Sequence, residues 1–432
     1  MKIVSARDQR ALIDLYRGGW NVAPEVQARV AEILAKVRLG GDATLVEFTR
    51  QFDAPNFQLE QLRVPLPSLA QVRATLPPLV AKGLELARKR VAQFHARQLH
   101  PDSQSQDADG TISGMLVRPL AAVGAYVPGG TAVLPSSVLM AVVPAKIAGV
   151  ERVVVATPPR RDGSIDPAVL YACVLCEADE VYAVGGAQAI AALAYGTASI
   201  APVDKIVGPG NVWVTEAKRQ VFGVCGIDGL AGPSEVLVVA DGEARPDLVA
   251  SEVLAQAEHD PLARVAVVSD DRGLLEKVAD LLSGDFAQAT GRQAIIDAVL
   301  AENTYLIEAA DEDEIIEVIE RFAPEHLSIQ TRDPWHLVPR IRRAGALFLG
   351  AETPVAAGDY LAGSNHTLPT SGAARFSSGL HTADFQRTMS LMANSAQRMA
   401  HDLPLLAAMA EFEGLPAHAR SARLRAQPES PA

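Results

Sequence analysis

The chain has 432 residues, of which 49% are hydrophobic and 21% charged, the composition of a globular protein with a large core and not of a disordered one. Its formal net charge is −12 and no segment concentrates lysine or arginine, so a nucleic-acid partner is not expected. The start, MKIVSARDQR, lacks the long apolar core of a signal peptide, and no apolar run reaches the roughly 18 residues of a membrane span. We therefore expect a cytoplasmic protein without membrane contact, built from two or three domains of roughly 150 residues each.

The first hundred residues are predicted to be mainly helical. Residues 1–24 are interpreted as an N-terminal helical segment, 25–49 as two helical segments broken at the glycine pair 40–41, and 78–97 as a further helix. Glycine, serine and aspartate crowd residues 102–114, which are interpreted as a loop.

Beyond residue 120, short β-branched runs alternate with helical patterns in two successive regions. In the first, the predicted strands are 121–127, 152–156, 180–184 and 205–207, and the predicted helices 136–148, 166–179, 187–195 and 211–222. In the second, the predicted strands are 236–240, 264–269, 304–307, 326–330 and 346–349, and the predicted helices 247–258, 312–322 and 334–343. This alternation predicts parallel sheets with right-handed crossovers.

The expected fold is α/β, with two Rossmann-like parallel-sheet units and a helical C-terminal arm that begins near residue 380. We group residues 25–120 with 235–378 as the first α/β domain, which carries most of the polar islands described next. Residues 121–234 form the second α/β domain, and 379–432 the arm.

Four short polar islands interrupt apolar stretches in the second half of the chain. They are Gln256-Ala-Glu-His259, Pro324-Glu325-His326, Gly358-Asp359-Tyr360 and Glu413-Gly-Leu-Pro-Ala-His418. Together they supply two imidazoles, a carboxylate and an amide oxygen, a ligand set that suits zinc, and they leave a Glu-His pair for acid/base catalysis. The islands therefore indicate an enzyme.

Each island also has a purely structural interpretation. Gln256 and His259, three apart at the end of a predicted helix, project about 60° apart on one face, as two ligands of one ion would, or they form a polar last turn. Glu325 and His326 are neighbours at a strand start and reach one site only if the strand edge is irregular; otherwise they are a capping carboxylate and a buried histidine.

Asp359 lies in a segment of small residues that suits close approach to a ligand or simply a turn, and His366, seven residues on, is a candidate to support a bound group. Glu413 and His418 flank a Gly-Leu-Pro break and are alternatively solvated surface groups. The pair Cys173 and Cys176 has no second C-x-x-C motif to complete a zinc site, so two buried helix cysteines are expected.

Three glycine-rich turns each follow a predicted strand and precede a predicted helix. They are Pro128-Gly129-Gly130, Gly185-Gly186-Ala187-Gln188 and Gly208-Pro209-Gly210-Asn211. Such turns present backbone N–H groups to a phosphate, although any tight strand-to-helix turn uses the same residues. The G-x-G-x-x-G fingerprint of dinucleotide-binding proteins is absent, so the pattern alone leaves a nucleotide ligand open.

Read together, these segments resemble the histidinol dehydrogenase family from about residue 25 to 425. The resemblance is carried by VGAYVPGGTAVLPSSVLM, VGGAQAIAALAYGT, KIVGPGN, AKRQVFG, GIDGLAGPSEVLV, LAQAEHD, PEHL, AGALFLG, GDYLAGSNHTLPTSGAARFSSGL and EGLPAHA, in that order. No single segment is decisive, but ten in sequence are specific.

The resemblance implies a role for each matching residue. Its zinc-ligand positions, which also contact substrate, are Gln256, His259, Asp359 and His418, with one Zn²⁺ per subunit. Its acid/base pair is Glu325 and His326, and its further substrate contacts are Ser234, His366 and Glu413. Its NAD contacts are Tyr126, Gln188 and Asn211, which places NAD on the domain 121–234.

The implied reaction is oxidation of L-histidinol to L-histidine through L-histidinal with two NAD⁺, the last steps of histidine biosynthesis. His326 is then the general acid/base and Glu325 activates water. The implied assembly is a homodimer whose C-terminal arm crosses over, so that His418 completes the neighbouring subunit's site.

The chain departs from the family pattern in two places, at Gly229-Leu230 before AGPSE and at HTADFQRTMS. These departures leave open a relative that oxidises another polar alcohol, such as a sulfonated diol, although Glu413 suits the cationic groups of histidinol. A zinc hydrolase with Glu325 as base, and a non-catalytic protein stabilised by a metal, are the alternatives from other classes.

Overall fold

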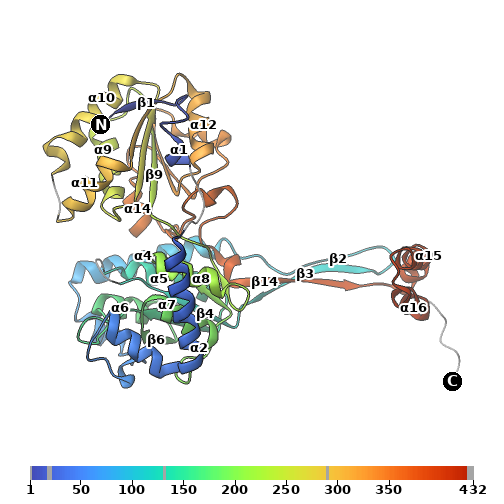
Figure 1. The fold of residues 1–432 in the computed structure, drawn as a ribbon. Coiled ribbons are helices and arrows are strands. Elements are labelled where there is room, and N and C mark those ends of the chain that lie inside the picture. Colours follow the sequence, from blue (N-terminus) through green and yellow to red (C-terminus); the bar gives the residue numbers. More distant parts are fainter. Residues whose placement is uncertain (1, 17–21, 130–132, 289–290, 426–432) are drawn as a thin grey trace. The chain divides into compact units, whose positions relative to one another are not determined.

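The computed structural model describes residues 2–16, 22–129, 133–288 and 291–425, and these fall into two compact units. Unit 1 comprises Met1–Gln98 and Leu120–Phe385, and unit 2 comprises Leu99–Pro119 and Gln386–Ala432. The expected fold class is confirmed, since unit 1 contains two parallel sheets and the described part of the chain ends in helices (Figure 1).

The first sheet of unit 1 is parallel throughout, with strand order β1-β11-β10-β9-β12-β13. Its strands are β1 (Ile3–Ser5), β9 (Glu235–Ala240), β10 (Arg264–Ser269), β11 (Thr304–Glu308), β12 (His326–Gln330) and β13 (Ala346–Leu349). Successive side chains of β9 enter cores on opposite faces: Val236 and Val238 on one, Leu237 and Val239 on the other.

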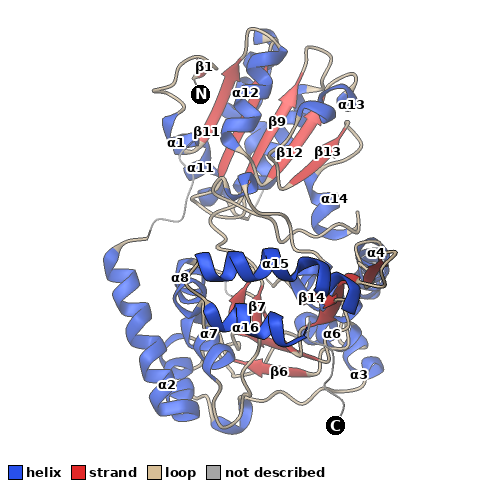
Figure 2. Ribbon diagram, turned by 90° about the vertical axis from the view of Figure 1, so that its right-hand side faces the viewer, coloured by secondary structure: helices blue, strands red, loops and turns tan. Residues whose placement is uncertain are grey.

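Helices cover both faces of this sheet (Figure 2). One core includes residues of α9 (Pro246–Ala257), α10 (Arg272–Ser283), α11 (Gln293–Glu302) and α14 (Val355–Tyr360). The opposite core includes residues of α1 (Ile13–Tyr16), α12 (Glu312–Phe322) and α13 (Pro334–Leu337). The helix predicted for residues 334–343 is shorter than expected: α13 ends at Leu337 and is followed by a 3₁₀ turn, Val338–Arg340.

The second sheet of unit 1 is also parallel, with strand order β6-β5-β4-β7-β8. Its strands are β4 (Ala122–Tyr126), β5 (Arg152–Thr157), β6 (Glu180–Ala183), β7 (Lys205–Val207) and β8 (Gly226–Ile227). The helices around it are α2 (Pro24–Phe52), α3 (Leu69–Arg73), α4 (Pro78–Ala96), α5 (Pro135–Ile147), α6 (Pro167–Leu175), α7 (Gly186–Tyr195) and α8 (Val212–Val221). The predicted break in the first helix is confirmed at Gly41, whose φ of 55° interrupts α2.

The packing of the N-terminal helices differs from the predicted grouping of 25–120 with 235–378. Buried residues of α2 and α4, such as Val30 and Val91, share one core with Val123 of β4 and Val154 of β5. Residues 99–119 belong to unit 2. In the expected N-terminal helical segment 1–24, β1 pairs with β11, α1 is a single short helix, and residues 17–21 lie outside the described ranges. The sequence pattern does not indicate which of the two sheets a helix covers, because the same apolar stripe could pack against either sheet.

Unit 2 is an antiparallel sheet followed by two helices. The sheet order is β14-β3-β2, with β2 (Ser103–Gln106), β3 (Ile112–Pro119) and β14 (Gln386–Ala393), and the helices are α15 (Ala396–Phe412) and α16 (Pro416–Arg425). The predicted loop 102–114 is thus wrong, and the arm is helical only after β14. The strand β2, Ser-Gln-Ser-Gln, is exposed throughout and is held by backbone pairing, so it lacks the apolar alternation by which strands are found.

No helix in the described part of the chain is long and apolar enough to cross a membrane. The three cysteines are buried and free, two of them on or just after α6, as expected.

Candidate active site

The predicted acid/base pair lies at the start of β12, in unit 1. Ala323 adopts a left-handed conformation (φ 49°, ψ 61°) after α12, and Glu325 precedes the strand, which begins at His326. The carboxylate oxygen Oε2 of Glu325 lies 3.5 Å from Nδ1 of His326, and both side chains are buried. The two side chains therefore approach each other at the start of the strand.

Residue Glu235, at the start of β9, anchors both members of the pair through its backbone. Its N–H donates to Oε2 of Glu325 at 2.9 Å, and its carbonyl oxygen lies 2.9 Å from Nδ1 of His326. When Nδ1 carries a proton and donates it to this carbonyl, Nε2 of His326 is left as the nitrogen that exchanges a proton. Burial disfavours charge on His326, but the carboxylates of Glu325 and Asp359 raise its pKa to about 9.

The side chain of Glu235 is a buried carboxylate that the sequence analysis missed. It forms an ion pair with Arg264 and accepts a hydrogen bond from the N–H of Ser371 at 3.1 Å, while its Oε2 has no partner among the described residues. Burial raises its pKa to about 7, against the opposing effect of Arg264 and with a contribution from Glu325. The available signal was a charged residue opening the otherwise apolar strand EVLVVA.

Two of the predicted zinc ligands, Gln256 and His259, are placed differently from the expected shared helix face. Helix α9 ends at Ala257, so His259 lies beyond the C-cap and its N–H donates to the carbonyl of Gln256 at 3.2 Å. Gln256 is buried and its Nε2 has no partner among the described residues, whereas His259 is exposed. The expected ~60° separation assumed a helix that continues through His259.

Asp359 lies on α14, next to α9. A buried carboxylate missed in the sequence, Glu252, joins the two helices by accepting the N–H of Val355 at 2.9 Å. Glu252 is one turn before Gln256, and Val355 one turn before Asp359. The bond therefore fixes the helix ends that carry Gln256 and Asp359 against each other, and a lone glutamate on the buried face of an apolar helix was the signal for it.

The donor set chosen from the sequence fits a divalent ion by its chemistry. Gln256 offers an amide oxygen with its amide nitrogen unpaired, and His259 and Asp359 offer nitrogen and oxygen. Within the described ranges, no three His, Cys, Asp or Glu side chains are arranged to hold an ion. In unit 1 the set includes only two residues of those types, because the fourth member, His418, belongs to unit 2.

The remaining predicted substrate residues of unit 1 lie near these groups. His366 is largely buried, its Nδ1 lies 3.0 Å from the carbonyl oxygen of Asp359, and burial lowers its pKa. Ser234 immediately precedes β9 and the anchoring Glu235, and its carbonyl accepts the N–H of Arg264 at 3.0 Å.

The three predicted NAD contacts lie together around one cavity of about 720 Å³ in unit 1. Tyr126 ends β4, Gln188 lies in the first turn of α7 after β6, and Asn211 is the N-cap of α8 after β7. The cavity thus opens at the carboxyl ends of parallel strands, beside the reversal of strand order between β4 and β7, where doubly wound sheets bind their ligands.

The turn that carries Asn211 is held from behind by a buried ion pair. Nζ of Lys218 donates to the carbonyl of Gly208 at 2.9 Å and contacts Asp228, whose other oxygen accepts the N–H of Gly208 at 2.7 Å. Gly208 has φ of +109°, and a Cβ there would lie 2.2 Å from the carbonyl oxygen of Tyr126, so only glycine fits. Gly130, in the first predicted turn, lies outside the described residues.

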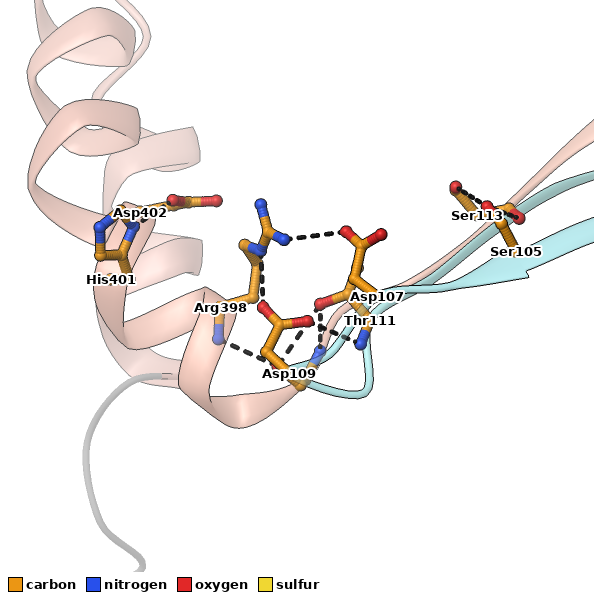
Figure 3. A network of polar contacts seen from close by, with 9 residues as sticks. Ser105, Asp107, Asp109, Thr111, Ser113, Arg398, His401 and Asp402 are labelled. Carbon is orange, nitrogen blue, oxygen red and sulfur yellow. Dashed lines mark hydrogen bonds and ion pairs between the residues drawn. The ribbon is translucent and has the colours of Figure 1, made fainter.

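The last two predicted residues, Glu413 and His418, are exposed in unit 2, at the C-cap of α15 and in the first turn of α16. Figure 3 shows the polar network that ties the β2–β3 hairpin to the start of α15. Arg398 pairs with Asp107 at 2.9 Å and with Asp109 at 2.8 Å, and the N–H of Thr111 and Arg398 hold the pKa of Asp109 at about 2. The hairpin therefore gives the helices that carry Glu413 and His418 a fixed attachment within unit 2.

Comparison with known proteins matches this chain over almost its whole length. A family model for histidinol dehydrogenase matches residues 19–426. Curated histidinol dehydrogenases from Synechococcus sp. and Methanothermobacter thermautotrophicus are 48% identical over 405 residues and 44% identical over 418 residues, covering 93% and 97% of this chain and 92% and 97% of their own. The crystal structure of histidinol dehydrogenase from Elizabethkingia anophelis is 31% identical, covers 98% of both chains and gives a TM-score of 0.92. The chain therefore belongs to the histidinol dehydrogenase family.

Proposed function

We propose that this protein oxidises L-histidinol to L-histidine through L-histidinal, with two NAD⁺ as hydride acceptors and one zinc ion per subunit. Family membership supports the substrate. The observation that carries the proposal is the buried pair Glu325 and His326, with Oε2 and Nδ1 3.5 Å apart and both anchored on Glu235. An acid and a base held this rigidly away from water suit successive proton transfers.

In the alcohol step His326 is the proton acceptor. Its Nδ1 faces the carbonyl of Glu235, so in the neutral imidazole, which becomes populated as the pH approaches 9, Nε2 takes the hydroxyl proton as a hydride leaves the same carbon. Gln256, His259, Asp359 and His418 would hold the zinc ion, which would supply positive charge for binding the substrate and no redox chemistry.

In the aldehyde step Glu325 removes a proton from the water that adds to the carbonyl carbon, and the resulting hydrate gives up the second hydride. The usual alternative is a thiolate nucleophile. Burial raises the pKa of Cys173, and raises those of Cys176 and Cys225 to about 12, so none supplies a thiolate at neutral pH. Glu325→Gln is expected to slow oxidation of L-histidinal more than that of L-histidinol; equal losses would contradict its role with water.

The cavity shared by Tyr126, Gln188 and Asn211 supports NAD as the hydride acceptor, because its position at the strand ends is that of a dinucleotide site. A zinc hydrolase with the same ligands has no use for this cavity. If the protein does not bind NAD⁺, the hydrolase alternative is favoured. If Glu325→Gln equals the parent in every assay, the protein is stabilised by a metal and is not a catalyst.

A homodimer with exchanged arms is part of the proposal. The helices of unit 2 leave large apolar side chains in solvent, among them Phe412 at 94% exposure, Leu405 at 66% and Met409 at 65%. Apolar surface of this extent in a small unit favours burial against another protein surface. The same arm carries Glu413 and His418, which would then complete the site of the second copy.

The competing substrate within the family is an anionic alcohol such as a sulfonated diol. Glu413 favours histidinol, because a carboxylate attracts its ammonium group and repels a sulfonate. Zinc-loaded protein is therefore expected to turn over L-histidinol and leave the diol unreacted. Oxidation of the diol with histidinol inert would transfer the function to that alcohol.

A further inference from the structure

The cavity lined by Tyr126, Gln188 and Asn211 also contains a carboxylate that no step above uses. Asp53 lies at the C-cap of α2 and lines the cavity, and its Oδ2 is buried without a hydrogen-bond partner among the described residues. Burial raises the pKa of Asp53 to about 6, and its charge contributes to the raised pKa of Tyr126. Asp53 and Tyr126 thus line the same cavity.

Helix stability does not explain this carboxylate. A negative charge at the C-terminal end of a helix opposes the helix dipole, and Asp53 contributes to the end of α2 through its backbone N–H, which donates to the carbonyl of Thr49 at 2.9 Å. A buried oxygen without a partner is also destabilising. Asp53 thus has the character of a binding group, whose partner arrives with a ligand.

The other aspartate of the cavity, Asp166, shows the contrast. Its Oδ1 accepts the N–H of Ala168 at 2.8 Å as the N-cap of α6, and its Oδ2 pairs with Arg160 at 2.6 Å. Both oxygens of Asp166 therefore have protein partners, whereas among the described residues the side chain of Asp53 has none.

The chemistry of a dinucleotide limits what Asp53 can bind. A carboxylate repels the pyrophosphate. The arginines that line the cavity and the backbone N–H groups of the turn at Gly186 are better suited to bind that group. Two carboxylate oxygens match the two neighbouring hydroxyls of a ribose. In doubly wound sheets such a carboxylate usually stands at the end of the second strand and selects NAD over NADP. Here β5, the second strand, ends in Thr157-Pro158-Pro159 and offers none.

We propose that Asp53 binds the 2′- and 3′-hydroxyls of the adenosine ribose of NAD and thereby excludes NADP. A residue at the end of α2 would then serve in place of the carboxylate that the end of β5 lacks. The inference rests on the proposed function, since it assumes that NAD occupies this cavity. A 2′-phosphate would bring a second negative charge against Asp53 and remove the hydroxyl that it accepts from.

The test is a calorimetric titration of the full-length protein with NAD⁺, its 2′-deoxyadenosine analogue and NADP⁺. The wild type should bind NAD⁺ about 10- to 100-fold more tightly than the deoxy analogue, the range expected for a hydrogen bond to a charged group. Asp53→Ala should weaken the binding of NAD⁺ more than that of the analogue, because the analogue offers the carboxylate only its 3′-hydroxyl. Asp53→Asn, which keeps the size of the side chain, should also bind NADP⁺ more tightly than the wild type does.

Glu47→Gln is the matched control, because Glu47 is exposed on the same helix and does not line the cavity. It should leave all three affinities unchanged, and the melting temperature should show that each variant is folded. Equal wild-type affinity for NAD⁺ and the deoxy analogue, or an equal loss of both in Asp53→Ala, would overturn the role of Asp53 while NAD⁺ binding itself leaves the proposed function standing. No binding of NAD⁺ by the wild type would overturn both.

Discussion

Replacing Glu325 by glutamine should shift the titration of its neighbour His326. At an effective dielectric constant of about 20, a carboxylate 3.5 Å from an imidazolium stabilises the charge by about 5 kcal/mol, which corresponds to roughly 3.5 pKa units. The pKa of His326 should therefore fall from about 9 to between roughly 5 and 6 in the variant, because burial, the opposing effect, remains.

The change has a consequence for stability. In the metal-free wild type the folded pKa of His326, about 9, exceeds the 6.5 of an unfolded histidine, so this contribution is fully present below pH 6.5 and is lost as the pH rises through 9. It amounts to roughly 3 kcal/mol. In Glu325→Gln the loss over this pH range should disappear.

The assay is an NMR titration of the imidazole signals of metal-free protein, combined with urea unfolding at several pH values. Glu252→Gln is the control, because Glu252 is a buried carboxylate that interacts with His326 without forming its ion pair. A wild-type pKa for His326 at or below 6.5, or the same pKa in Glu325→Gln, would refute the reasoning.

Three further outcomes are expected. His259→Asn should abolish zinc binding and activity together, measured by metal analysis after gel filtration, and stoichiometric zinc in the variant would contradict its assignment as a ligand. The variants Glu325→Gln and His418→Asn should each be inactive in histidine formation, but a mixture of the two refolded together should regain about a quarter of wild-type activity. Random association makes half of the dimers mixed, and with exchanged arms each mixed dimer has one intact site out of two. No recovery of activity would exclude exchange of the arms. Lys218→Met should destabilise the protein by about 3–5 kcal/mol in urea unfolding, because it leaves Asp228 buried without its cation, and a loss below 1 kcal/mol would show that the pair is unimportant.

The periodic elements of unit 1 could be predicted because their signal is local. The strand β9 and the helix α12 have the apolar runs and stripes that their burial requires, and both were found within a residue or two. The three residues at the cavity were implied by the family resemblance. Their clustering agrees with the topology, since Tyr126 ends β4, Gln188 and Asn211 follow β6 and β7, and the carboxyl ends of parallel strands lie at one edge.

What could not be predicted depends on partners far along the chain. The exposed strand β2 exists only because its backbone pairs with β3, and α2 covers the second sheet and not the first because of which apolar stripe fills which core. The carboxylates Glu235 and Asp53 could not be predicted as site residues, because a single charged residue in a sequence does not indicate whether its oxygens have hydrogen-bond partners in the fold. The position of His259 depends on the residue at which α9 ends. Helix propensity does not determine a helix end to within one turn.

The central claim is a four-electron oxidation, and it is tested most directly by the NADH formed per L-histidinol consumed by zinc-loaded protein, with the product identified. Two NADH per histidinol, with L-histidine as the product, is the predicted result. One NADH per histidinol with L-histidinal released, or no oxidation of histidinol at all, would contradict the account.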